Sequence, residues 1–112
     1  MAEIKQFYRI ANPNGEGVWY DRSGNFTGRI HNEFNFCKNS ELEMEFDETI
    51  VGYLSAAESL EDLKVWFPDE DIEQLRRFGY NIVVYESIDY KWYEKFNHYV
   101  IHQETSNIIN FL

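Results

Sequence analysis

Short runs of apolar residues, rich in aromatic and β-branched types and separated by polar turns, predict a chain dominated by short β-strands. IKQFYRIA (4–11) and YNIVVYES (80–87) are the clearest examples. Turns containing Asn, Pro and Gly separate the first segments, so residues 4–31 predict a three-stranded meander. Extended segments are expected at 4–11, 18–21, 26–31, 41–47, 49–55, 80–87 and 98–103.

Two short helices are predicted between residues 59 and 78. Ser59 is a suitable N-cap, because its hydroxyl can accept a hydrogen bond from the first turn of a helix. The segment LEDLKVWF (60–67) then places apolar side chains on one helical face. PDEDIEQLRRF (68–78) begins with acidic residues, ends with two arginines and is followed by Gly79. This order suits the helix dipole and a glycine that closes the helix.

The remaining segments complete an antiparallel arrangement. Residues 32–40 predict a loop or a short helix, and the aromatic segment 88–97 predicts a connection between strands. We expect strand 98–103 to pair with strand 80–87, because strands that follow one another usually lie side by side. The tail from residue 104 keeps apolar residues to its end, which predicts a docked terminus.

The expected fold class is α+β, with an antiparallel-dominated sheet of about five to six strands packed on two short helices. The 112 residues suit a single domain spanning 1–112. Cys37 is the sole cysteine, so neither an internal disulfide nor a cysteine-based metal site is expected. The sequence contains no signal peptide and no apolar run long enough to span a membrane, so we expect a soluble cytoplasmic protein.

Negative charge is concentrated in the central third of the chain. The formal net charge is −10, and residues 41–73 contain twelve acidic residues against one base, Lys64. In ELEMEFD four carboxylates share one face of the predicted strand about 6.6–6.8 Å apart, comparable to the spacing of phosphates along a nucleic acid. These residues are Glu41, Glu43, Glu45 and Asp47. They form either a ladder read by a basic partner or a solvated face that protects a sheet edge.

Acidic residues at the start of the second predicted helix extend this charge. Asp69, Glu70 and Asp71 are a second candidate contact set, although helix N-termini favour acids in any case. Such an acidic face argues against direct binding of nucleic acid, because it repels phosphates. It suits a basic protein or nucleoprotein complex that itself grips nucleic acid.

The sequence contains no enzyme signature and no metal-binding pattern. P-loop, GxGxxG and GxSxG motifs are absent. His98 and His102 are four residues apart, but on a strand they lie about 13 Å apart, too far to share a metal ion. We therefore expect no cofactor and no metal, and we favour a binding protein over an enzyme.

Three stretches resemble small proteins of bacteriophages and prophages. They are FYRI, GYLSAAESLEDLKVWF and FGYNIVVYES, which together cover the layout of residues 4–102. The small, acidic, aromatic-rich profile also resembles phage inhibitors of the anti-CRISPR or anti-restriction type. The resemblance implies a phage-encoded inhibitor in the host cell cytoplasm. Its acidic, nucleic-acid-mimicking face would bind a basic host nucleic-acid-handling or defence complex.

The same order of elements also resembles compact ADP-ribosyltransferases, which supplies an alternative. That resemblance implies a cofactor contact at Arg9, a contact at the strand-to-helix junction from Tyr53 or Ser55, and a catalytic Glu86. The chain is shorter than that fold and lacks its Ser-Thr-Ser-like signature. A non-enzymatic form of the alternative is a domain that sequesters a small nucleotide, with Arg9, His31 and Tyr53 as ligand contacts. In either form these residues are expected to converge on one pocket.

Overall fold

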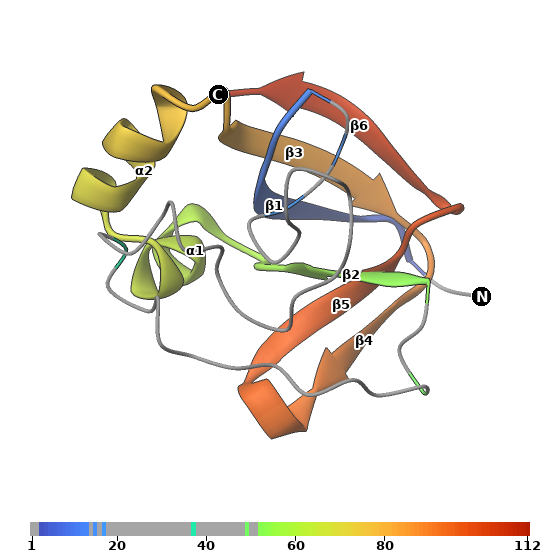
Figure 1. Ribbon diagram of the computed structural model, residues 1–112. Helices are drawn as coiled ribbons and strands as arrows, with labels where there is room; N and C mark the ends of the chain where they lie inside the picture. The colour runs from blue at the N-terminus through green and yellow to red at the C-terminus, as the bar shows by residue number, and fades with distance from the viewer. Residues whose placement is uncertain (1–2, 14, 16, 18–36, 38–48, 50–51) are drawn as a thin grey trace.

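The protein's structure, a computed structural model, describes residues 3–13, 15, 17, 37, 49 and 52–112. Within these residues the chain forms six strands, two α-helices and a short 3-10 helix. In chain order they are β1 (Lys5–Ala11), β2 (Tyr53–Ala56), α1 (Leu60–Trp66), α2 (Asp69–Arg76), β3 (Asn81–Ser87), β4 (Tyr90–Tyr93), η3 (Glu94–Phe96), β5 (His98–His102) and β6 (Ser106–Phe111). The predicted α+β class with an antiparallel core is confirmed (Figure 1).

The six strands form two three-stranded antiparallel sheets in place of one continuous sheet. The first sheet has the order β1-β3-β6 and the second has the order β2-β5-β4. An isolated bridge joins β1 to the chain just after β2. There Tyr8 N–H donates to Ala57 O at 2.7 Å, and Ala57 N–H donates to Tyr8 O at 2.8 Å. This bridge holds the two sheets together at one end.

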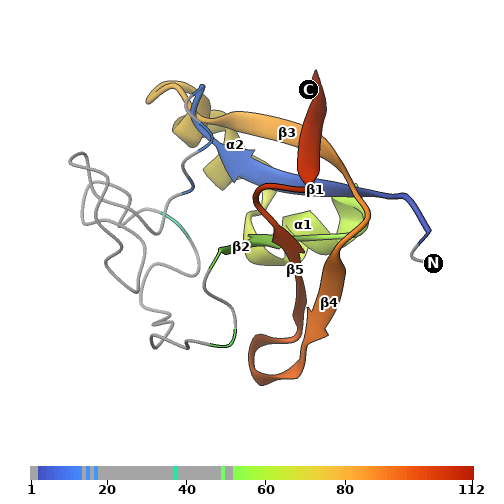
Figure 2. The same cartoon turned by 90° about the vertical axis from the view of Figure 1, so that its right-hand side faces the viewer.

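A long bent hairpin also joins the two sheets. β3 runs into β4, and β5 runs into β6, so the same two chain segments pair with each other in both sheets (Figure 2). At the bend, Ser106 Oγ lies 2.8 Å from Ser87 Oγ and 2.6 Å from His102 O. His102 N–H donates to Asp89 O at 2.8 Å. These contacts replace ladder hydrogen bonds where the strands turn, as buried polar atoms require.

Successive side chains of β1 and β3 point to opposite sides of the first sheet, and both sides are buried. Ile10 and Ile82 point toward the helices, where they pack with Leu63, Ile72 and Leu75. The other face packs against the second sheet. Its residues are Phe7, Ala11, Val83 and Tyr85, which meet Ala56 and Ile101. The first sheet therefore packs against the helices with one face and against the second sheet with the other.

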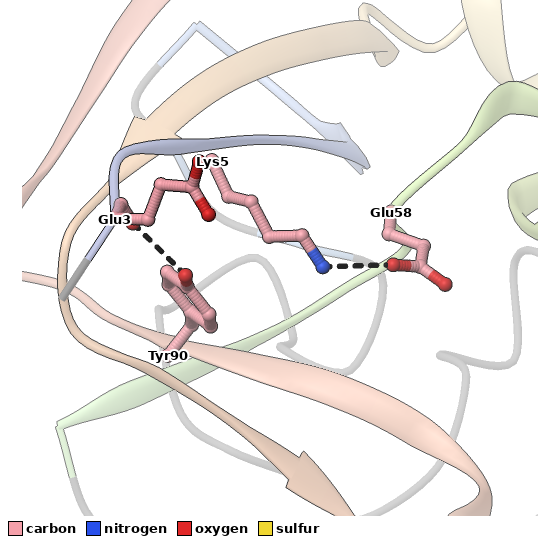
Figure 3. A network of polar contacts seen from close by, with 4 residues as sticks. All are labelled: Glu3, Lys5, Glu58 and Tyr90. Atoms are coloured by element: carbon pink, nitrogen blue, oxygen red, sulfur yellow. Dashed lines mark hydrogen bonds and ion pairs between the residues drawn. The ribbon is translucent and has the colours of Figure 1, made fainter.

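The start of β1 is tied to the second sheet and to the segment before α1 (Figure 3). Lys5 Nζ forms an ion pair with Glu58 Oε2 at 3.0 Å, and the Tyr90 hydroxyl donates to the backbone oxygen of Glu3 at 2.9 Å. The hydrogen bond to Glu58 raises the pKa of Lys5. Because both charged groups are solvent-exposed, this pair contributes little to stability.

Ser59 caps α1, as the sequence predicts. Its Oγ accepts a hydrogen bond from Asp62 N–H at 3.1 Å. Glu61 and Asp62 stand in the first turn, where the unpaired backbone N–H groups favour negative charge.

The predicted glycine closure of the second helix is also confirmed. After α2, Gly79 N–H donates to Arg76 O and Tyr80 N–H donates to Leu75 O, both at 3.1 Å. This pattern requires a left-handed residue, and Gly79 has φ of 89°. A glycine adopts this conformation without steric cost.

Gly79→Ala is expected to lower the free energy of unfolding by about 1–2 kcal/mol, the cost of a left-handed alanine. A Cβ at this position meets no atom within 4 Å, so the loss comes from backbone strain and not from a clash. Urea unfolding measures it. Gly79→Asn is the matched control and should lose less, because asparagine tolerates this conformation better. Equal losses for the two variants would contradict the strain explanation.

Two predictions about the C-terminal half are wrong in detail. Segment 88–97 is not simply a connection, because it contains β4 and the 3-10 helix. Strand β5 accordingly pairs with β4 and β2, whereas the neighbours of β3 are β1 and β6. The bend at residues 88–89 contains neither Gly nor Pro, so the sequence does not signal it. The docked tail is confirmed, because it forms β6 on β3.

Several predicted segments lie outside the described residues. These are 18–21, 26–31, 41–47 and, apart from Cys37, 32–40. The segment expected to be extended at 49–55 is described as strand β2 from Tyr53 onward. In the portion that the structure describes, no helix has the length and apolar character needed to cross a membrane.

Candidate functional site

In the described part of the acidic segment, α1 and α2 expose five carboxylates. They are Glu61, Asp62, Asp69, Glu70 and Glu73, called here the helical acidic surface. Most of them stand in the first turn of a helix. The same two helices turn Leu63, Ile72 and Leu75 toward the first sheet. The apolar side of each helix therefore fixes its position and leaves the carboxylates available to a partner.

One ion pair partly neutralises this surface. Lys64 Nζ lies 3.0 Å from Asp69 Oδ1, and the two side chains are 43 % and 77 % exposed. Such an exposed pair is weak and exchanges readily. Among the described residues, Glu61, Glu70 and Glu73 have no ion-pair partner, so most of the charge on the helical acidic surface is not neutralised internally.

Asp71 does not belong to this surface, although the sequence predicts it as a contact. It is 6 % exposed, because α2 turns it inward together with Ile72 and Leu75. Burial, together with the nearby negative charge of Asp71, raises the pKa of the Cys37 thiol to about 12. Asp71 is therefore a buried residue beside Cys37 and is removed from the predicted contact set.

The other predicted contacts, Glu41, Glu43, Glu45 and Asp47, lie outside the described residues. Their arrangement as a carboxylate ladder stays a prediction. Their charge belongs to the same central segment as the helical acidic surface.

The second sheet has a polar and aromatic face on the side away from the first sheet. The strand register places seven residues on it, namely Tyr53, Ser55, Lys91, Tyr93, His98, Val100 and His102. We call these residues the polar sheet face. The alternate residues Leu54, Ala56 and Ile101 point the other way, into the core shared with the first sheet.

His98 and Ser55 are hydrogen-bonded to each other on the polar sheet face. His98 Nε2 lies 3.0 Å from Ser55 Oγ, and the tautomer of the imidazole decides which group donates. The His98 ring packs edge-on against Trp66 of α1 at 5.7 Å and against Tyr93 at 5.8 Å, centre to centre. The hydrogen bond and the aromatic rings together fix the orientation of the imidazole.

Tyr53 lies at the other end of the polar sheet face. Its hydroxyl donates to Asp89 Oδ1 at 2.9 Å, and this bond raises the pKa of Tyr53. Lys91 Nζ lies 4.6 Å from the centre of the Tyr53 ring, and the His102 ring packs edge-on against it at 5.1 Å. The Tyr53 hydroxyl is therefore engaged within the protein, which limits its use as a nucleotide contact.

Arg9 is buried between the two sheets at 5 % exposure. Its Nε donates to Ser55 O at 3.1 Å, and its Nη1 donates to Gly15 O at 2.8 Å and to the Tyr85 hydroxyl at 3.3 Å. A Cβ at Gly17 would come within 2.8 Å of Nη2, so a larger residue there would require the guanidinium to shift. Arg9 therefore has an internal, structural set of contacts.

The residues predicted for a transferase do not gather around one site. Arg9 is in register with Val83, whereas Glu86 is in register with Gln6. Neighbouring positions on a strand face opposite sides, so the side chains of Arg9 and Glu86 point to opposite faces of the first sheet. Ser55 contacts Arg9 through its backbone oxygen, which accepts a hydrogen bond from Arg9 Nε. His31 lies outside the described residues. The convergence expected of Arg9 and Glu86 is not found.

The described residues contain no group of three or more His, Cys, Asp or Glu side chains placed to hold a metal ion. His98 and His102 stand four residues apart on β5. Both side chains therefore lie on the same face of the second sheet, as predicted for a strand.

A model of one protein family matches residues 1–110, almost the whole chain. The family is described as the Bacteriophage T4 Y00F protein. The chain belongs to this family. No curated protein and no solved structure matches it. The predicted resemblance to small phage proteins is confirmed at the level of a phage protein family.

Sequence reasoning missed the His98–Ser55 pair of this Y00F-family protein. Alternation alone puts His98 and His102 on one side of a strand, and Tyr53 and Ser55 on one side of another. Only the register, with Ser55 opposite Val100 and Tyr53 opposite His102, shows that these sides coincide. No local signal in the sequence states which strands pair.

Proposed function

We propose that this Y00F-family protein is a phage-encoded inhibitor that binds a basic host protein or nucleoprotein complex. The target handles nucleic acid or serves in host defence, and binding takes place in the host cell cytoplasm. The acidic residues of segment 41–73 compete with nucleic acid for a groove lined by Lys and Arg. Attraction between opposite charges speeds association, and contacts at the centre of the interface fix the pose.

One observation carries the proposal: the net negative charge is gathered in one segment, and the described part of that segment is displayed. Residues 41–73 carry twelve acids against one base, whereas the rest of the chain is nearly balanced. The helical acidic surface exposes five of these acids on two adjacent helices. A scattered excess of acids would support solubility alone, but a segregated one supports recognition of a basic surface.

The nucleotide-binding alternative has less support. Arg9 is occupied by Ser55 O, Gly15 O and Tyr85, and Glu86 points to the opposite face of the first sheet. The polar sheet face retains hydrogen-bonding groups, but Tyr53 already donates to Asp89. We therefore propose no transferase activity.

Neutralising the exposed acids of α2 is expected to weaken capture of the host target about tenfold at low salt, since exposed charge pairs contribute about 0.2–1 kcal/mol each. The variant is Asp69→Asn with Glu70→Gln and Glu73→Gln. The measurement is affinity capture from host lysate, followed by identification of the bound proteins and titration with duplex DNA. The wild type should capture a basic, nucleic-acid-binding complex, and DNA should displace it.

The matched control neutralises the same number of acids outside the segment, with Glu3→Gln, Glu86→Gln and Glu94→Gln. Circular dichroism must first show that all variants fold alike. A second arm replaces Glu41, Glu43 and Glu45 by Gln and Asp47 by Asn, and tests the predicted ladder. If the control loses capture as strongly as the α2 variant, net charge alone is responsible. If no basic partner is captured even at low salt, the inhibitor proposal is wrong.

A further inference from the structure

The outer edge of the first sheet is formed by β6, and its residues are unusually apolar for an edge. β6 is hydrogen-bonded to β3 on one side, and no described strand pairs with its other side. The exposed apolar residues in and just after this strand are Ile108 (43 %), Ile109 (42 %), Phe111 (56 %) and Leu112 (43 %). An exposed edge of this kind is a template for pairing with another strand.

The backbone at this edge has groups directed outward. Leu112 N–H donates inward to Ile82 O at 2.8 Å. Successive N–H groups of a strand point to opposite sides, so Phe111 N–H points away from β3. It is held by the side chain of Asn110, whose Oδ1 lies 2.9 Å away. Asn110 is exposed, so its side chain can rotate aside and leave this N–H to an incoming strand.

Segment 106–112, SNIINFL, lacks two of the features that usually protect an edge, although the register of β6 on β3 shifts at Ile109, between the pairs Val84–Asn110 and Tyr85–Ile108. It contains no charged side chain and no proline. The whole chain carries a net charge of −10, so two copies repel each other over much of their surface. Segment 106–112 adds no charged side chain to this repulsion, and its apolar area is available to bury.

We propose that β6 pairs antiparallel with β6 of a second copy of this chain. The two three-stranded sheets then form one six-stranded sheet across a two-fold axis, in which each copy uses the same surface. This inference is independent of the proposed inhibitor function.

Charges at the two ends of β6 match in this arrangement. Arg76 Nη1 donates to Leu112 O at 2.8 Å, which places the guanidinium at the C-terminal end of the strand. Glu104 is exposed and precedes β6 by two residues. Antiparallel pairing brings the end of one strand beside the start of the other. Arg76 of each copy then faces Glu104 of the partner subunit. The two-fold axis generates two such pairs.

The first test compares Ile109→Lys with Val65→Lys by sedimentation equilibrium. Ile109 lies near the middle of β6, so two lysines meet at the two-fold axis and the dimer should dissociate. Val65 is 64 % exposed on α1, so the same change there should leave the dimer intact. Wild type that stays monomeric at the highest soluble concentration overturns the proposal, as does an Ile109→Lys variant that stays dimeric.

A second test does not rely on an apolar substitution. Glu104→Lys should weaken dimerisation about tenfold, because each lysine faces Arg76 of the partner subunit. Glu94→Lys, at the far end of the β4–β5 hairpin, should have no such effect and controls for net charge. If both variants change dimerisation equally, the antiparallel β6 pairing is wrong. If the wild type is monomeric but binds an extended peptide at this edge, the partner is another protein and the proposal of a second copy fails.

Salt separates this inference from the proposed function. Added salt screens the repulsion between two copies of charge −10 as well as the Arg76–Glu104 pairs, so dimerisation through the apolar edge should persist at high salt. The same salt should weaken binding to a basic partner. Failure of one proposal therefore leaves the other testable.

Discussion

Replacing Phe7 with alanine is expected to lower the free energy of unfolding by about 3–5 kcal/mol. Phe7 has no exposed surface, and its ring lies 5.2 Å from that of Tyr90 and 5.4 Å from that of Tyr99, centre to centre. Truncation leaves a cavity where the two sheets meet, and the surrounding strands cannot all collapse into it. Urea unfolding followed by circular dichroism measures the loss.

Two controls make the Phe7 prediction specific. Phe7→Leu keeps most of the volume and should cost roughly 1–2 kcal/mol. Ile4→Ala removes an apolar side chain that is 63 % exposed just before the same strand, so it should change stability by no more than about 0.5 kcal/mol. A Phe7→Ala loss as small as that of Ile4→Ala would contradict the packing of the second sheet on the first.

Arg9→Met is expected to lower the free energy of unfolding by about 2–4 kcal/mol, because hydrogen bonds to a charged group contribute about 1.5–3 kcal/mol each and removing the buried charge offsets part of that loss. The guanidinium links β1 to Ser55 in β2 and to Gly15 in the turn after β1. Methionine fills much of the same volume but donates no hydrogen bond. Denaturant unfolding of variant and wild type under identical conditions provides the comparison.

The controls for Arg9 separate its contacts. Arg9→Lys keeps the charge but loses the planar fork of donors, so an intermediate loss is expected. Tyr85→Phe removes the hydroxyl 3.3 Å from Nη1 and should cost about 1 kcal/mol. Unchanged stability in Arg9→Met would show that Arg9 is not a structural residue and would return it to the candidates for ligand binding.

The helices were predictable because their signals are local. The Ser59 hydroxyl meets a backbone N–H three residues away, and Gly79 closes a turn whose partners lie within five residues. Such contacts depend on the nearest sequence and little on the rest of the fold. The strand character of β1 and β3 was equally readable, because a strand with two buried faces is rich in β-branched and aromatic residues whichever strands it pairs with.

The division into two sheets could not be read from the sequence. It depends on the bend at residues 88–89, which is closed by Ser87, Ser106 and backbone groups of Asp89 and His102. Ser87 and Ser106 are nineteen positions apart, so no local pattern announces their contact. Missing this bend led to the wrong prediction that strand 98–103 pairs with strand 80–87.

The candidate site shows the same contrast. The charge of segment 41–73 is a property of composition, so the sequence reveals it directly. Burial decides which of those acids a partner can reach, and it excludes Asp71 while leaving Asp69 and Glu70 exposed. Helical periodicity predicts which acids are buried only when the side of the helix that faces the core is known.

The sequence by itself determined the α+β class, the two helices with their caps, the strand character of β1, β3 and β5, and the segregated negative charge. These follow from short-range hydrogen bonding, side-chain periodicity and residue counts. Only the tertiary structure decided how the strands divide between two sheets, that Arg9 turns inward while Glu86 turns to the opposite face, and that His98 meets Ser55. Those outcomes rest on strand register and on contacts between residues far apart in the chain, because pairing free energy depends on which strands meet and not on each strand alone.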